Sequence, residues 1–151
     1  SDAAFREAAG KQKIVYTDKD ATAQSCKLAA HFHPAWNRCS QYAKKLHGRN
    51  SFQVLGRDLK TPSTFLICST PDGATTHKER SIRTGGTGTA ISIADHYKIP
   101  VFNLAKPEHL KRMLSFLDET MPAKQLKQLS CSDYLKRNHL PKSSIKSMKN
   151  L

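Results

Sequence analysis

The chain has 151 residues, with 25 lysine and arginine residues against 12 aspartate and glutamate residues, and a formal net charge of +13. No apolar run of about 18 residues or more and no signal-peptide pattern is present, so we expect a cytoplasmic protein that does not contact membranes. The four cysteines form no C-x-x-C pair, which argues against a zinc or disulfide framework. The positive charge favours a polyanionic partner, either nucleic acid or a phosphorylated nucleotide.

The first part of the chain is expected to be mostly helical, with one short strand. A strand is favoured where β-branched and aromatic residues gather in "KIVYTD", and helices where small apolar residues recur every three or four positions. Gly48 is expected to close the last of these helices, and residues 50–59 fit either a helix or an extended segment. The expected elements are a helix over 1–10, a strand over 13–18, and helices over 20–32 and 35–47.

The second part of the chain alternates strands and helices. The apolar segment 63–70 is typical of a strand buried on both faces, and the polar residues 71–88 read as a long functional loop. A helix over 89–97, a strand over 99–105 and a helix over 106–120 follow. This order is typical of a βαβ unit, which requires a parallel sheet.

These elements predict an α/β fold of the Rossmann-like, three-layer kind with a parallel sheet. Residues 1–120 are expected to form the nucleotide- or phosphate-binding domain. Residues 121–151 are basic and polar, and we expect them to form a basic helical C-terminal extension. Weak helices are expected over 124–129 and 132–137, with the last ten residues disordered.

The sequence "GGTGT" at residues 85–89 lies between a predicted strand and loop and a predicted helix. Ligands of such sheets bind beyond the carboxyl ends of the strands, where a helix N-terminus offers free N–H groups. Glycines let the backbone approach a phosphate closely, and Arg83 can add a charged contact. The segment therefore predicts a phosphate-binding loop. It matches neither G-x-G-x-x-G nor a P-loop, and the alternative is a turn that packs the helix on the sheet.

The loop "STPDGATT" at residues 69–76 is expected to lie at the same edge of the sheet. Asp72 can accept hydrogen bonds from a ribose or act as an acid or base, or the segment is a plain turn. Ser1 and Asp2, at the start of the first predicted helix, are weaker candidates for an anion site. The seven histidines show no H-x-x-x-H spacing with a nearby carboxylate, so we expect no metal site and no cofactor.

The segments "FLICSTPDGATT" and "GGTGTAISIADHYKIPVFNLA" together resemble the SLOG superfamily of Rossmann-like proteins, over about residues 1 to 117. This superfamily includes the DprA/Smf recombination mediators and the LOG phosphoribohydrolases, and the nearest resemblance is to small phage and bacterial DprA-like proteins. Such proteins begin with a strand, helix and strand that this sequence lacks. The alternatives are that the sequence is a fragment, that processing removed the segment, or that a separate chain supplies it. The residues that the resemblance assigns to the ligand are Gly85, Gly86, Thr87, Gly88, Thr89, Thr70, Asp72, Gly73, Ser1, Asp2, and the Arg49–Asn50 pair, which either contacts the ligand or stabilises the fold.

The resemblance implies three functions. The first is a module that binds a nucleotide or a nucleotide-derived phosphorylated ligand. The second is a DprA-like protein that binds single-stranded nucleic acid, as a monomer or a homo-oligomer. The third is a nucleoside-monophosphate N-glycosidase, for which LOG enzymes use a glutamate after the glycine loop. Here that place holds Ala90, Ile91 and Ser92, so Asp72 or Asp2 would have to replace it, and we expect a binding module rather than an enzyme.

Overall fold

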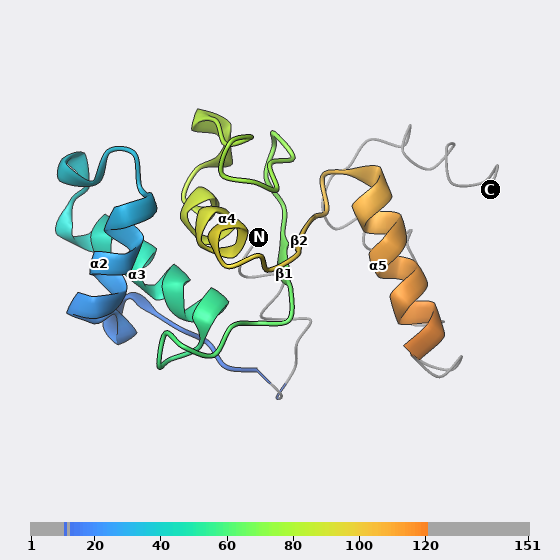
Figure 1. Cartoon of the computed structure of the whole chain (residues 1–151), viewed down its shortest axis with the longest axis horizontal. Helices are drawn as coiled ribbons and strands as arrows, with labels where there is room; N and C mark the ends of the chain where they lie inside the picture. The colour runs from blue at the N-terminus through green and yellow to red at the C-terminus, as the bar shows by residue number, and fades with distance from the viewer. Residues whose placement is uncertain (1–10, 12, 121–151) are drawn as a thin grey trace. The chain divides into compact units, whose positions relative to one another are not determined.

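The computed structural model describes residues 11 and 13–120, with side chains up to residue 116. The chain divides into two compact units, residues 1–110 and 111–151, and the structure describes the second only as far as Thr120. The elements, drawn in Figure 1, are α2 (Ala23–Phe32), α3 (Gln41–Leu55), β1 (Leu66–Cys68), α4 (Thr87–His96), β2 (Val101–Asn103) and α5 (Pro107–Thr120), with 3-10 turns η1 (Asp18–Asp20), η2 (Trp36–Arg38) and η3 (Ile82–Thr84).

The two strands form a parallel sheet. Leu66, Ile67 and Cys68 pair with Val101, Phe102 and Asn103, in that order. A parallel pair needs a crossover, and α4 provides it, so β1, α4 and β2 form the expected βαβ unit. The α/β prediction is confirmed at this level, and the three-layer Rossmann arrangement stays a prediction.

Helix α4 is the centre of the core. In Figure 1 it lies between the α2–α3 pair and the two strands. Its residues 88–94 are all buried, and Ile91 and Ile93 have no exposed surface. Ile93 belongs to a cluster with Phe32 and Leu55, whereas Ile91 packs with Cys68 towards the sheet. Because apolar side chains cover α4 on both sides, its N-terminus is held in a fixed place.

The strand predicted over residues 13–18 is wrong. Residues 13–17 have no regular secondary structure, and η1 begins at Asp18. Ile14 is 80% exposed and Val15 is 38% exposed. Their β-branched side chains favour an extended backbone, but a strand also needs a neighbouring strand for its hydrogen bonds, and the described residues supply none here.

The prediction that Gly48 closes a helix is also wrong. Helix α3 begins after Ser40, whose hydroxyl accepts a hydrogen bond from the Ala43 N–H, and continues to Leu55. Gly48 lies inside this helix, at its contact with α2: a Cβ atom placed there would be 2.7 Å from the Sγ atom of Cys26. The missing side chain allows the two helices to approach, so this glycine has a packing role.

The other predicted elements are present with changed bounds. Helix α4 begins two residues earlier than expected, each strand is shorter than its apolar segment, and residues 50–55 are helical. No helix in the described ranges is both long enough and apolar enough to cross a bilayer. The helices predicted over 1–10, 124–129 and 132–137 lie outside the described residues.

Candidate functional site

The glycine loop is held by side chains of α3. The Nδ2 atom of Asn50 donates a hydrogen bond to the Gly86 carbonyl oxygen at 3.2 Å. One turn earlier, the Nδ1 atom of His47 is 2.9 Å from the hydroxyl of Thr89, in the first turn of α4. Gly85 has φ of +60°, a conformation that favours glycine. The loop is therefore fixed from the helical side and leads directly into α4.

A cleft of about 530 Å³ opens beside this loop. It lies at the N-terminus of α4 and runs along β1 to the strand's carboxyl end, where ligands of parallel sheets bind. Its third wall is the segment 13–16, and the Nη1 atom of Arg49 donates a hydrogen bond to the Tyr16 carbonyl oxygen of that segment at 3.2 Å. The lining residues are Lys13, Ile14, Val15, Tyr16, Ala43, Leu46, His47, Arg49, Asn50, Gln53, Leu66, Ile67, Cys68, Ser69, Gly86, Thr87 and Ala90.

The structure brings some of the predicted site residues together at this cleft and places others beside it. Gly86, Thr87, Arg49 and Asn50 line the cleft. Gly85 and Arg83 are exposed next to it, and Gly88 and Thr89 are buried in α4. Thr70, Asp72 and Gly73 lie in the neighbouring turn and do not line the cleft. Ser1 and Asp2 are outside the described residues.

Asp72 connects the turn after β1 to the turn before the glycine loop. Its Oδ1 atom accepts hydrogen bonds from the Thr70 hydroxyl at 2.8 Å and the Ala74 N–H at 3.3 Å. Its Oδ2 atom accepts hydrogen bonds from the hydroxyls of Ser81, at 2.6 Å, and Thr84. Desolvation alone would raise the pKa of Asp72, but these hydrogen bonds outweigh it and hold the pKa well below its usual range. An aspartate in this state is a poor acid or base near neutral pH.

We expect Asp72→Asn to lower stability at pH 7 and to weaken its pH dependence in acid. A depressed pKa in the folded state means that ionised Asp72 stabilises the fold above its unfolded pKa of about 3.9. That contribution is lost as the pH falls through the folded pKa. Urea unfolding from neutral to acid pH measures it, with Asp18→Asn as the matched control. If the free energy of unfolding of wild type and Asp72→Asn falls equally with pH throughout this range, ionised Asp72 does not stabilise the fold.

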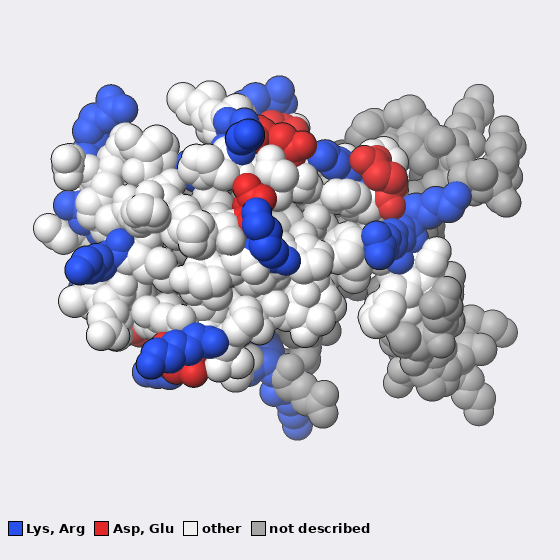
Figure 2. Space-filling model, in the orientation of Figure 1, with Lys and Arg blue, Asp and Glu red and all other residues white. Residues whose placement is uncertain are grey.

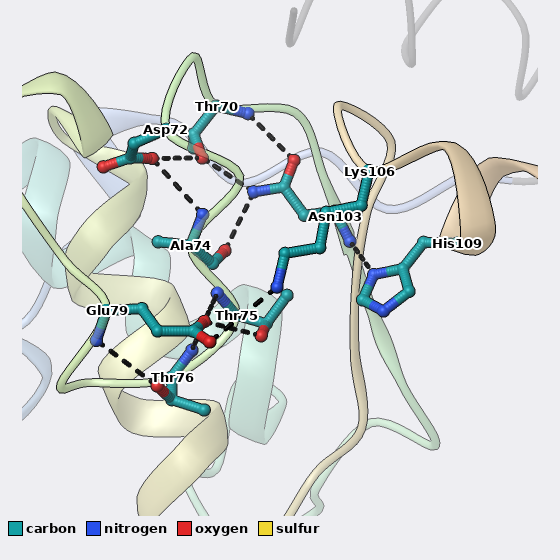
Figure 3. A network of polar contacts seen from close by, with 9 residues as sticks. All are labelled: Thr70, Asp72, Ala74, Thr75, Thr76, Glu79, Asn103, Lys106 and His109. Carbon is teal, nitrogen blue, oxygen red and sulfur yellow. Dashed lines mark hydrogen bonds and ion pairs between the residues drawn. The ribbon is translucent and has the colours of Figure 1, made fainter.

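Asn103 joins the ends of the two strands. Its side chain has no exposed surface, and its Nδ2 atom donates to the Thr70 hydroxyl at 2.7 Å and to the Ala74 carbonyl oxygen at 2.8 Å. Its Oδ1 atom accepts from the N–H groups of Thr70 and Ala105, each at 3.2 Å. Figure 3 shows these bonds beside a second group, in which Glu79 accepts from two threonines. The strand-end turn is thus rigidly attached to β2.

The charges on one face of the first unit are distributed rather than gathered. On the face in Figure 2, lysine and arginine side chains stand in separate groups, and several of these groups lie beside aspartate or glutamate. Ion pairs among the described residues include Arg57 with Asp20 at 3.5 Å and Lys106 with Glu79 at 3.8 Å. This face therefore offers no continuous basic stripe.

Sequence reasoning missed two features. It did not place the segment 13–16 at the cleft. Of the loop 69–76, which was expected there, only Ser69 lines the cleft. It also did not connect His33, Cys39 and His47, because their spacing matches no common ligand pattern. Their ligand atoms lie within 4.8 Å of one another, so they could hold a metal ion. The expectation that no metal site exists has to be reopened for these residues.

Comparison with known proteins gives no further guide to this site: no family model, no curated protein and no solved structure matches the chain. The resemblance to the SLOG superfamily stays a prediction.

Proposed function

We propose that this protein binds a nucleotide or a nucleotide-derived phosphorylated ligand in the cleft between α4, β1 and the segment 13–16. The observation that carries the proposal is the position of this cleft, whose wall includes Gly86 and Thr87 at the N-terminus of α4. Backbone N–H groups and the helix dipole favour an anion there. A Cβ atom on Gly86 would meet nothing within 4 Å, so a phosphate can approach the backbone.

The lining of the cleft offers groups for both parts of a nucleotide. Lys13 and Arg49 supply positive charge to the lining, which favours a phosphate. Ile14, Val15 and Leu66 supply apolar surface, which favours a base. A volume of about 530 Å³ is in the usual range of small-molecule sites, which is about 300–1,000 Å³.

Single-stranded nucleic acid is the second candidate ligand, and the net charge of +13 favours it. The basic groups on the face that Figure 2 shows are separate, so this face gives a strand no continuous track of positive charge. An N-glycosidase has less support, since Asp72 is ionised and does not line the cleft. Nucleic-acid binding would fall steeply with salt, whereas release of a free base would indicate the enzyme.

Gly86→Val is expected to abolish nucleotide binding without unfolding the protein. Gly86 has φ of −61° and ψ of −26°, which valine adopts without strain, and its side chain would occupy open space where we place the phosphate. A thermal-shift titration with millimolar nucleoside mono- and diphosphates measures this, with the matching nucleosides as controls. Ligand at about 100 times its Kd stabilises the wild type by about 2.7 kcal/mol.

Charge variants provide the matched comparison. Arg49→Gln is expected to weaken phosphate-dependent stabilisation, and Arg57→Gln, on the same stretch of chain but outside the cleft, is expected to leave it unchanged. A Gly86→Val protein that melts like wild type and still responds to the same nucleotides would overturn the proposal.

A further inference from the structure

Three side chains from separate parts of the sequence meet beside α3. His33 follows α2, Cys39 follows η2, and His47 lies within α3. The Sγ atom of Cys39 is 3.8 Å from Nδ1 and 3.7 Å from Nε2 of His33. The imidazole ring centroids of His33 and His47 are 4.4 Å apart. A thiol and two imidazoles thus form one cluster, and each is half-buried.

We propose that His33, Cys39 and His47 form a binding site for a zinc-class divalent ion, with a fourth position open to water. Zinc binds thiolate sulfur at about 2.3 Å and imidazole nitrogen at about 2.0–2.1 Å, so two such ligands of a tetrahedral ion lie about 3.6 Å apart. The sulfur–nitrogen separations of this cluster are close to that value. Thiolate and imidazole together are a ligand set that zinc and cobalt prefer.

A neighbouring hydroxyl orients one of the ligands. The Nδ1 atom of His47 is hydrogen-bonded to Thr89 at 2.9 Å, and Thr89 is buried in α4. If Nδ1 carries the proton in this bond, Nε2 presents its lone pair for an ion. Histidine ligands in proteins are usually held in this way by a partner on the second ring nitrogen. Thr89 is therefore a positioning residue for this site.

Two local interactions compete with the ion. The Nδ1 atom of His33 accepts a hydrogen bond from the Ala35 N–H at 3.1 Å, so its Nε2 atom carries the proton when the ring is neutral. Binding an ion through Nδ1 takes the accepting lone pair, and binding through Nε2 moves the proton to Nδ1, so either mode replaces this hydrogen bond. The Arg80 guanidinium carries a positive charge that acts on both His33 and His47. The Cys39 thiolate offsets that charge when the thiol releases its proton on binding. The balanced step is one ion bound, one sulfur–metal bond formed and one proton released.

Cobalt titration of the full chain tests the site. Bound Co²⁺ is expected to give a thiolate-to-cobalt charge-transfer band and the visible bands of tetrahedral cobalt, and Zn²⁺ should remove both. Trp36, the only tryptophan of the chain, has its ring centroid 6.0 Å from that of His33 and 6.3 Å from that of His47. Saturable quenching of its fluorescence by Co²⁺ reports the same binding.

Cys39→Ser is expected to remove the charge-transfer band, and Cys26→Ser to keep it. His33→Ala and His47→Ala should each weaken Co²⁺ binding by at least about tenfold, because loss of a residue that only supports a metal ligand already weakens binding by about that much. His31→Ala should leave Co²⁺ binding unchanged. Thr89→Val should weaken Co²⁺ binding and keep the cobalt spectrum. If Thr89 only stabilised the fold, a folded Thr89→Val protein would bind Co²⁺ like the wild type. Circular dichroism checks that each variant is folded.

Two results would overturn this site. One is a wild-type protein that shows no saturable cobalt spectrum, and the other is a folded Cys39→Ser protein that keeps the charge-transfer band. The inference does not depend on nucleotide binding, because Gly86→Val should leave the cobalt spectrum intact. Loss of one activity without the other therefore identifies which proposal fails.

Discussion

Gly48→Val is expected to destabilise the first unit by roughly 1–3 kcal/mol, the usual range for overpacking a tight contact. The new Cβ atom would lie 2.7 Å from the Sγ atom of Cys26, 3.1 Å from the Ser25 hydroxyl oxygen and 3.3 Å from the backbone nitrogen of Cys26. Alanine normally gains about 0.5–1 kcal/mol over glycine inside a helix, and β-branched valine gains less. Here the cost of the clash exceeds the gain in helix propensity, because the backbone of α2 also lies close to the new side chain and limits how far it can be relieved.

Urea unfolding of four proteins measures this contact: wild type, Gly48→Val, Cys26→Ala and the double variant. Cys26→Ala removes the nearest atom, so the double variant should recover part of the stability that Gly48→Val loses, and the difference is the coupling energy. Full additivity of the two changes would show that the α2–α3 contact is not limited by this pair of residues.

Asn103→Leu is expected to cost about 3 kcal/mol or more. Leucine has a similar volume, but it leaves the Thr70 N–H and the Ala74 carbonyl oxygen without their side-chain partner inside the protein. Each buried polar group left unsatisfied costs about 1–3 kcal/mol. Because Asn103 joins β1's end to β2, the loss affects the sheet and the turn that carries Asp72 together.

The free energy of unfolding in urea gives the size of this effect, with Asn37→Leu on the exposed η2 turn as the control. Asn103→Asp is a second probe: its carboxylate keeps acceptors for the N–H groups of Thr70 and Ala105 but faces the Ala74 carbonyl oxygen without a proton to donate. If Asn103→Leu unfolds at the same urea concentration as wild type, the amide is not the junction that its hydrogen bonds indicate.

Local signals predicted the βαβ unit but not the lengths of its parts. The periodicity of Ile93 and Ala94 is dictated by burial, and both residues are in the core. The apolar segment around Ile67 was expected to be buried on both faces, but Ile67 is only partly buried and Phe65 is 39% exposed. Ile14 and Val15 show the limit of such signals, since β-branched residues form a strand only where a partner strand exists. Gly48 shows another limit, because the reason for this glycine lies on a different helix.

The position of the glycine loop could be predicted from the sequence, but the side chains that hold it in place could not. Gly86 and Thr87 could be placed at a sheet edge from the order of elements alone. The Asn50 amide reaches the Gly86 carbonyl from 36 positions away, and no sequence pattern joins them. Asp72 was expected to line the crevice beside the loop, but it does not line the cleft, and its hydrogen bonds come from hydroxyl groups nine and twelve positions later in the chain.

The pairing of the strands also has a kinetic consequence. Thr70 and Asn103 are 33 positions apart, and the sheet that they complete has only three residue pairs. Contact between α2 and α3 closes a shorter loop, with Cys26 and Lys44 18 positions apart, and brings more surface together. Because loop closure has to precede the gain from distant contacts, the helical hairpin should assemble first and act as the template on which the strands later join.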